Sequence, residues 1–235
     1  QIVPEIDVEP HDLSVDYIVT PDAVIETRTP YPKPTRIDWR LLDDERLGAM
    51  PVLAQLREAR WREMSVPELL VPGLDILFVG LNPGRRSASK GHNFAGPGNH
   101  FWRLLHESGL TPVRYRPEEE RQLLGHRLGI TNLVARPTRG EADLTWDEMH
   151  RGGELLRKKV AAFRPRIVAL LGKNVYRAYA NLRPSSPVAW GRAEQETIAG
   201  VVEYVAPNPS PRSAVSYAER LRHFEDLRAL RALLG

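Results

Sequence analysis

The chain has 235 residues, and its 33 Lys and Arg against 30 Asp and Glu leave a formal charge of only +3. Its length is typical of one α/β domain with extensions, and the lack of cysteine excludes disulfides, thiolate zinc sites and cysteine-ligated iron–sulfur clusters. No apolar run approaches the roughly 20 residues that span a bilayer and no signal peptide is visible, so we expect a cytoplasmic protein without a membrane partner.

The beginning of the chain differs in composition from the rest. Residues 1–35 are rich in Pro, Asp, Glu and Val, which predicts an extended or partly disordered arm with a short strand near residues 16–20. Residues 44–64 have a helical pattern, and we interpret its arginines as a solvated face in preference to phosphate contacts: Arg57, Arg60 and Arg62. We therefore expect an N-terminal arm over 1–35 and a single domain over 36–235.

A buried strand leads into a long loop in the middle of the chain. The apolar run from Leu74 to Val79 is followed by a segment rich in Gly, Ser and Asn that extends to residue 98. Asn82 follows this strand directly, where its amide can act as both donor and acceptor. Phe94 stands between small and polar residues, so its ring could stack on a flat heterocycle.

The remaining elements alternate between strands and helices. We expect helices at 99–109, 117–126, 145–163, 173–180 and 214–233, and strands at 129–134, 166–171 and 201–206. Thr145 and Glu148 form a capping box, and Trp102 is assigned to the core. This order predicts a three-layer α/β/α domain with a short, mostly parallel central sheet. Its loops 80–98, 135–140 and 207–213 should then meet at one edge.

Four motifs together resemble a known family. GLNPG at 80–84, KGHNFAGPGNHFW at 90–102, ITNLVARPT at 130–138 and NPSPRS at 208–213 occur in the order and spacing of the mismatch-specific uracil-DNA glycosylases, bacterial relatives of thymine-DNA glycosylase. The resemblance covers about residue 74 to the C-terminus. It implies the uracil-DNA glycosylase fold and a monofunctional enzyme of base excision repair that flips a base and hydrolyses its N-glycosidic bond, without metal or cofactor.

The resemblance also implies where this enzyme would act. The expected substrate is double-stranded DNA with G·U or G·T mispairs, with single-stranded DNA as a second possibility. The protein would be a nucleoid-associated monomer in the bacterial cytoplasm. Uracil, thymine and damaged pyrimidines would all stack on Phe94, so the preferred base stays open.

The family assigns roles to several residues of the loop after the strand. Asn82 matches its water-positioning asparagine, while backbone groups of Leu81 and Phe94 would contact the uracil edge and the Phe94 ring would stack on it. Ser87 stands at a small pocket position, where it could bond to the base or to the 5′ phosphate. An amide cannot deprotonate water, so the resemblance implies a modest enzyme that depends on stabilising the leaving base.

Asn93 has two interpretations. It precedes Phe94, and we favour a turn-forming role because the family does not fix this residue. The alternative is a catalytic position, with the hypothesis that a carboxylate at residue 93 would supply the missing general base.

The last motif matches the family's intercalation loop and would bind DNA through Pro211, Arg212 and Ser213. Arg212 occupies the wedge position, where relatives often have an aliphatic residue, so it could fill the gap left by the base or bond to the widowed guanine. Lys90, Arg85, Arg86 and Arg139 are candidate phosphate contacts, with solvated loop charge as the alternative. The residues alone do not decide whether Arg136 and Arg139 line a DNA groove or only keep the loop soluble.

Two other functions are compatible with these residues. A DNA mismatch-binding or lesion-binding module that barely cleaves is the main alternative, because no carboxylate stands beside Asn82 in the sequence. A generic nucleotide-binding α/β protein is the other. It is disfavoured because Gly172-Lys173 lacks the upstream glycine of a phosphate-binding loop.

Overall fold

The computed structural model describes residues 17–19, 24–26 and 66–234. The chain divides into two compact units, residues 1–60 and 61–235. In the first unit, β1 (Tyr17–Val19) pairs antiparallel with β2 (Val24–Glu26), so a strand lies where one was expected. The predicted helix at 44–64 and the predicted domain boundary at 35/36 lie outside the described residues.

The second unit is built on a five-stranded sheet in the order β4-β3-β5-β7-β6. Four strands are parallel: β3 (Ile76–Gly80), β4 (Leu128–Asn132), β5 (Ile167–Leu171) and β7 (Val202–Ala206). The two-residue strand β6 (Gly191–Arg192) joins the β7 edge antiparallel, in a segment for which no strand was predicted. Nearly every residue of the parallel strands is buried, as expected for a sheet covered on both faces.

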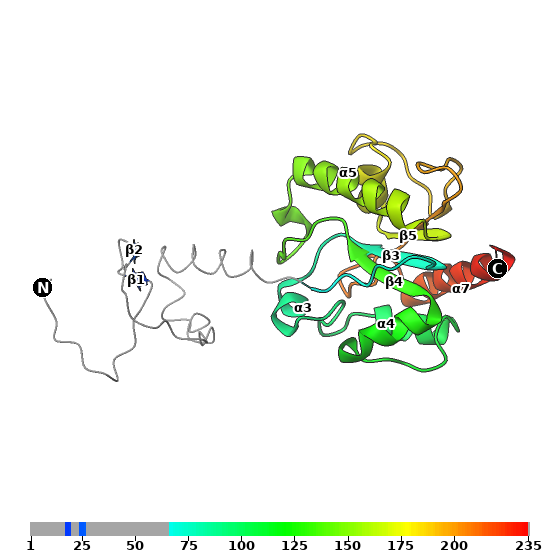
Figure 1. Ribbon diagram of the computed structural model, residues 1–235, viewed down its shortest axis with the longest axis horizontal. Helices are drawn as coiled ribbons and strands as arrows, with labels where there is room; N and C mark the ends of the chain where they lie inside the picture. Colours follow the sequence, from blue (N-terminus) through cyan, green and yellow to red (C-terminus); the bar gives the residue numbers. More distant parts are fainter. Residues whose placement is uncertain (1–16, 20–23, 27–65, 235) are drawn as a thin grey trace, which may run out of the picture. The chain divides into compact units, whose positions relative to one another are not determined.

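Helices cover both faces of this sheet (Figure 1). On one face, α4 (Phe101–Glu107) and α7 (Tyr217–Leu234) pack on alternate strand residues that include Ile76 and Phe78. On the other face, α5 (Trp146–Phe163) and α6 (Lys173–Tyr179) pack on the intervening residues, which include Leu77 and Val79. The predicted three-layer α/β/α fold is confirmed. Among the described residues, no helix is long and apolar enough to cross a membrane.

The helix α5 is fixed at its start and close to its neighbours. Thr145 accepts the Glu148 N–H while the Glu148 side chain accepts the Thr145 N–H, which confirms the predicted capping box. A Cβ atom at Gly152 would overlap the Leu133 carbonyl oxygen, and one at Gly153 would overlap the Ala178 carbonyl oxygen. These two glycines therefore let α5 lie directly against the segment that follows β4 and against α6.

A buried ionic cluster fastens α7 to the amino end of the sheet. Asp75, which precedes β3, lies 3.0 Å from the Arg231 guanidinium and 3.1 Å from that of Arg127. Arg166 approaches the same carboxylate at 3.8 Å. Arg231 also donates to the His126 carbonyl oxygen, so one side chain of α7 ties together two segments at this end of the sheet.

The segment expected to be one long loop, 80–98, contains a short helix, α3 (Arg85–Lys90). Gly84 adopts an extended conformation before it, and Gly91 ends it at a φ of +72°, where glycine carries no steric cost. The predicted helix at 117–126 is present as the 3-10 segment η2 (Pro117–His126). At its start the Arg116 N–H donates to Glu119 Oε2 at 2.9 Å.

Candidate active site

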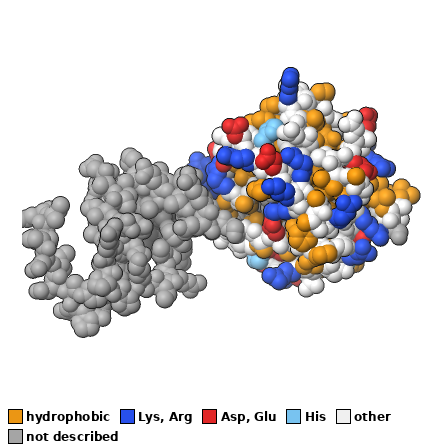
Figure 2. Space-filling model, turned by 45° about the horizontal axis from the view of Figure 1, so that its top comes forward, with side chains coloured by type: hydrophobic (Ala, Val, Ile, Leu, Met, Phe, Trp, Pro, Cys, Tyr) orange, Lys and Arg blue, Asp and Glu red, His pale blue; other side chains and the backbone are white. Residues whose placement is uncertain are grey.

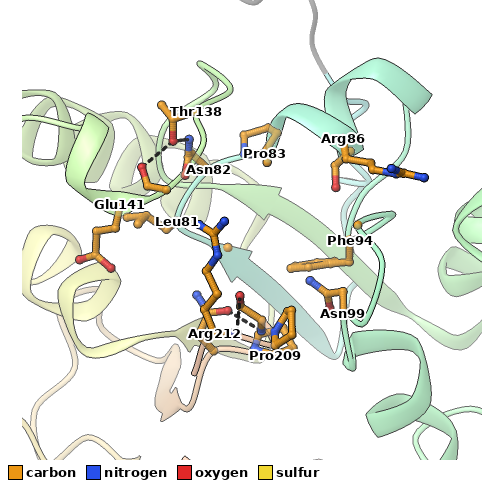
Figure 3. Close-up of a pocket in the computed structure, with 18 of the residues that line it drawn as sticks. Leu81, Asn82, Pro83, Arg86, Phe94, Asn99, Thr138, Glu141, Pro209 and Arg212 are labelled. Carbon is orange, nitrogen blue, oxygen red and sulfur yellow. Dashed lines mark hydrogen bonds between the residues drawn. The ribbon is translucent and has the colours of Figure 1, made fainter. Parts of the chain in front are cut away.

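A cavity of about 890 Å³ opens at the carboxyl ends of the parallel strands (Figure 3). Its lining comes from the segments after β3, β4 and β7, so the predicted meeting of the loops 80–98, 135–140 and 207–213 is confirmed. Leu171 at the end of β5 also contributes. Segments more than a hundred residues apart in the sequence thus form one site at the edge where parallel α/β sheets bind ligands.

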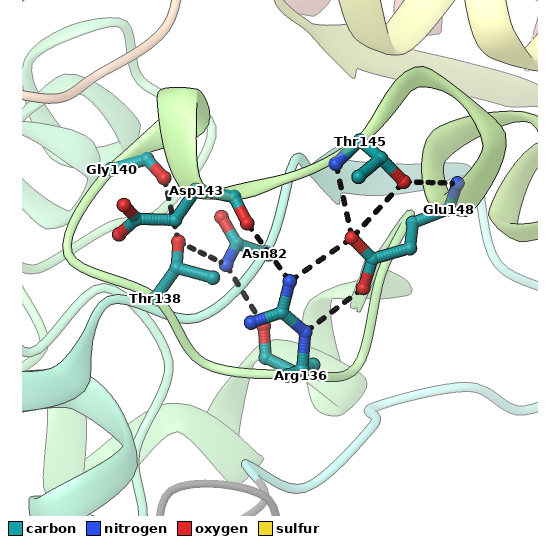
Figure 4. Close-up of polar contacts among 7 residues, drawn as sticks. All are labelled: Asn82, Arg136, Thr138, Gly140, Asp143, Thr145 and Glu148. Atoms are coloured by element: carbon teal, nitrogen blue, oxygen red, sulfur yellow. Dashed lines mark hydrogen bonds and ion pairs between the residues drawn. The ribbon is translucent and has the colours of Figure 1, made fainter. Parts of the chain in front are cut away.

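Asn82 is held in one orientation on the wall of this cavity (Figure 4). Its Nδ2 donates to the Arg136 carbonyl oxygen at 2.9 Å and to the Thr138 Oγ1 at 2.8 Å. Thr138 is buried, and its hydroxyl in turn donates to the Gly140 carbonyl oxygen at 2.8 Å. Both N–H groups of the amide are therefore engaged. Within the described part of the chain no donor reaches the Asn82 Oδ1, which stays available as an acceptor.

Arg136 supports Asn82 from behind. Its guanidinium donates to both carboxylate oxygens of Glu148, at 2.9 and 3.0 Å, and to the Asp143 carbonyl oxygen at 2.9 Å. The hydrogen bonds from Arg136 lower the pKa of Glu148 to about 2. Arg136 thus anchors the turn 135–140 to the start of α5. This structural contact was not predicted from the sequence, where a DNA-groove contact and loop solubility were the two interpretations. Arg139 is exposed on the cavity wall.

Phe94 has a conformation that is uncommon for a bulky residue. Its φ is +52°, in the left-handed region, where a non-glycine residue costs about 1–2 kcal/mol. The ring stacks on Phe101 with 4.0 Å between the centroids and 24° between the planes. Phe94 lines the cavity and is only partly buried, and Figure 3 shows its ring lying across the wall. One face of the ring is thus packed against the protein, which leaves the other for a ligand.

The neighbours of Phe94 are tied on both sides. The Ala95 N–H donates to the buried Ser87 Oγ at 3.1 Å. On the other side, Asn93 is buried, and its backbone N–H and its Nδ2 both donate to Glu120 Oε2, each at 2.9 Å. Ser87 therefore positions the platform in this structure. The contact predicted from Ser87 to the base or the 5′ phosphate stays a prediction, as does the catalytic alternative for Asn93.

Asn132, at the carboxyl end of β4, provides a second amide in the cavity. Its Nδ2 donates to the Asn93 Oδ1 at 3.3 Å. A Cβ atom at Gly80 would come within 2.6 Å of the Asn132 Oδ1 and 3.5 Å of the Phe94 ring, so this oxygen lies close to the edge of the platform. A side chain at residue 80 would therefore displace the Asn132 amide from its present position.

The loop 207–213 forms the opposite wall and is fixed by several hydrogen bonds. Asn208 Oδ1 accepts the Ser210 N–H at 2.8 Å, and the Pro209 carbonyl oxygen accepts the His100 N–H at 3.0 Å. The Ser210 carbonyl oxygen accepts from Arg220 Nη1 at 3.0 Å. Arg220 is 5% exposed, so a buried guanidinium holds the loop from below.

Arg212 crosses the mouth of the cavity. Its side chain is exposed, and its Nη1 donates to the Arg139 carbonyl oxygen at 3.0 Å, on the far wall. Figure 3 shows this side chain rising from the loop toward Leu81 and Asn82. Pro211 and Ser213 also line the cavity.

Two further predicted residues have different surroundings. The Leu81 carbonyl oxygen accepts the Val134 N–H at 2.9 Å, so a hydrogen bond from Leu81 to a base would come from its N–H group. Lys90 is exposed at the end of α3 and is not part of the cavity lining. The phosphate contact predicted for Lys90 would therefore lie outside the cavity.

Sequence reasoning missed four residues of the site: Asn132, Thr138, Glu120 and Glu141. Asn132 and Thr138 follow the rule that identified Asn82, since both are polar and lie at or after the carboxyl end of a parallel strand. Glu141 lines the cavity, and one of its carboxylate oxygens accepts from Asn174 Nδ2. Glu120 carries no comparable signal, because three consecutive glutamates open the segment η2. Among the described residues, no group of three or more His, Asp and Glu gathers as a metal ligand set.

Comparison with known proteins supports the superfamily to which the motifs belong. The model of the uracil DNA glycosylase superfamily matches residues 67–230, which is well over half of the chain. This range includes every residue that lines the cavity. The chain is also similar to a candidate uracil DNA glycosylase from Methanosarcina acetivorans, solved in solution by NMR, with 20% sequence identity and a TM-score of 0.49. That match covers 74% of this chain and 99% of the other.

Proposed function

The chain belongs to the uracil DNA glycosylase superfamily, and we propose that it excises uracil, and also thymine, from G·U and G·T mispairs in DNA. The observation that carries this proposal is the combination of an aromatic platform and two oriented amides in one cavity. Phe94 supplies the platform, Asn132 an amide at its edge, and Asn82 an amide on the adjoining wall.

The cavity suits a pyrimidine that has been turned out of the helix. Its base would stack on Phe94, while the free oxygen and the remaining N–H of the Asn132 amide would meet its polar edge. The volume of about 890 Å³ exceeds the size of a single base. This volume supports the acceptance of thymine beside uracil.

The bond to the sugar would break without a general base. Cleavage puts positive charge on the sugar and negative charge on the departing base, so donors at the base edge lower the barrier. Asn82 would hold the attacking water through its free Oδ1, with its N–H groups engaged by Arg136 and Thr138. An amide cannot take the proton, and the lack of a base typically costs about 10²–10⁴-fold in rate. The proposed enzyme is therefore slow and gains selectivity from the ease of opening a mispair.

The loop 207–213 would fill the space left by the extruded base. It is held in advance by Arg220 and by the His100 backbone, which limits the entropy lost on binding DNA. Arg212 would leave the Arg139 carbonyl oxygen and enter the duplex beside the widowed guanine. Figure 2 shows Lys and Arg side chains spread over one face of the molecule with fewer acidic ones between them, as suits a polyanionic partner.

The test is single-turnover excision from oligonucleotides that carry uracil opposite guanine, opposite adenine, or unpaired. We expect abasic product in all three, fastest for the mispaired or unpaired base, and a loss of about 10²-fold or more in Asn82→Ala. If no abasic product forms despite tight, salt-sensitive binding to the mismatch, the proposed glycosylase activity is refuted. That outcome would favour the alternative, a binding module, which the lack of a carboxylate bonded to Asn82 among the described residues also supports.

A further inference from the structure

A buried carboxylate lies behind the aromatic platform. Glu120 is 2% exposed and comes from η2, outside every motif that builds the cavity. Its Oε2 accepts from the Asn93 N–H and from the Asn93 Nδ2, while its Oε1 lies 2.9 Å from the His92 Nδ1. Among the described residues, His92 is the only basic side chain within ion-pair distance of Glu120. A carboxylate buried in this way is costly unless its hydrogen bonds serve the structure or the site.

This carboxylate forces the orientation of the Asn93 amide. A carboxylate that accepts from the Asn93 backbone N–H presents only acceptors, and the Pro67 carbonyl oxygen, 2.8 Å from the same amide nitrogen, also only accepts. The NH₂ end of Asn93 must therefore face Glu120 and Pro67. Its Oδ1 must then face the other way, toward Asn132.

Asn93 fixes the orientation of the Asn132 amide in the same way. Because an oxygen faces it, Asn132 must present its NH₂ end to Asn93, at 3.3 Å. Its Oδ1 and its second N–H are then left for the cavity, beside the edge of Phe94. A series of hydrogen bonds, each with a fixed donor and a fixed acceptor, thus links Glu120 through Asn93 to the Asn132 amide, which would contact the base.

We propose that Glu120 is a positioning residue that fixes, through Asn93, the orientation of the Asn132 amide and thereby the preference for a base with an N3–H donor and an O4 acceptor. This inference rests on the proposed function. Uracil and thymine have that edge and match an amide with its oxygen toward N3 and its N–H toward O4. Cytosine has an N4–H₂ donor and an unprotonated N3, so it matches only the reversed amide. The fixed Asn132 amide would therefore exclude cytosine, the normal base that most resembles uracil.

The test measures the ratio of the excision rates of uracil and N3-methyluracil, each unpaired in the same oligonucleotide. The methyl group replaces the N3–H from which Asn132 Oδ1 would accept a hydrogen bond. We expect the wild-type protein to excise uracil at least about tenfold faster, as one lost hydrogen bond with an unsatisfied partner implies. In Glu120→Leu the ratio should fall toward one. Glu120→Gln should restore much of the preference, since its oxygen can still accept from Asn93 while its NH₂ faces His92.

Controls separate positioning from simple loss of structure. Glu118→Gln, on the exposed side of the same segment, should leave the ratio unchanged. Asn132→Ala should lower the ratio by itself, and adding Glu120→Leu to it should lower the ratio no further. If Glu120→Leu does not fold, Asn93→Leu, which removes the acceptor that faces Asn132, tests the same chain of contacts.

The outcomes distinguish this inference from the proposed function. Absence of uracil excision by the wild-type protein would refute the glycosylase itself. Normal excision with an equal fall in both rates in Glu120→Leu would instead overturn the positioning role, because a purely structural defect affects both substrates alike. An additive effect of Glu120→Leu in the Asn132→Ala background would overturn it as well.

Discussion

The substitution Thr138→Val removes one of the two acceptors that hold Asn82 and changes little else in shape. The lost hydrogen bond, 2.8 Å long in the structure, contributes about 0.5–1.5 kcal/mol to the orientation of the amide. If that energy is lost from the transition state, single-turnover excision of uracil falls by about two- to tenfold. The Arg136 carbonyl oxygen still holds the amide, so the loss should be much smaller than in Asn82→Ala.

Thr138→Ser is the matched control, because it keeps the hydroxyl and removes only the buried methyl group. Both variants should lose stability. The valine leaves an Asn82 N–H unpaired, at a cost on the order of 1–3 kcal/mol, while the Gly140 carbonyl oxygen keeps the Asp143 N–H as a donor. The serine loses a methyl group, at about 0.8 kcal/mol. Melting temperatures report these losses, while excision rates well below melting report the orientation of Asn82. Equal excision rates in Thr138→Val and the wild type, or equal losses in the two variants, would refute this account of Asn82.

Four other changes test separate parts of the structure. Arg212→Ala should weaken excision from paired substrates more than from single strands, measured by single-turnover rates; equal losses would argue against a wedge. Asp75→Asn should lower the free energy of unfolding by about 3 kcal/mol in urea denaturation, because three arginines lose their shared carboxylate. Burial raises the pKa of Glu203, so its ionisation opposes folding and stability should fall as pH rises through that pKa. In Glu203→Gln this decline, measured as melting temperature against pH above the ordinary glutamate pKa, should disappear. Asn93→Asp should lower both the melting temperature and the excision rate, because a carboxylate oxygen would replace the Asn93 Nδ2 that now lies 2.9 Å from Glu120 Oε2. Faster excision would instead favour the hypothesis that a carboxylate at residue 93 supplies the missing general base.

Much of the scaffold could be predicted because its signals are local. The apolar run 74–79 and the capping box of Thr145 and Glu148 each depend on neighbouring residues, and both are confirmed. The helix α3 was missed because six residues between two glycines give too short a period to recognise. Its first turn is instead stabilised by a distant contact, in which the Arg85 N–H donates to the Thr138 carbonyl oxygen at 3.2 Å.

The site was predicted less completely, for a physical reason. Asn82 and Phe94 could be found because a polar residue after a buried strand and an isolated aromatic residue stand out in the sequence. Glu120 could not, because the property that matters is its burial against Asn93, 27 residues away, and nothing in three consecutive glutamates shows which one is buried. The contact of Arg136 with Glu148 was missed for the same reason, since Glu148 already had a local role in the capping box.

The two amides of the cavity are oriented by the same device from opposite sides. Behind Asn82 stand a carbonyl oxygen and a hydroxyl whose own proton is committed to Gly140, so both accept, and the free end of the amide is an oxygen. Behind Asn132 stands the oxygen of Asn93, fixed in turn by the carboxylate of Glu120, so one N–H is committed and the other end is free. Neither amide changes its charge with pH, and each could act in either direction if it were free to rotate. The chemistry proposed for this cavity therefore depends on the acceptors behind the amides as much as on the amides themselves, and substitutions in that outer layer should change which base is chosen as well as how fast it is removed.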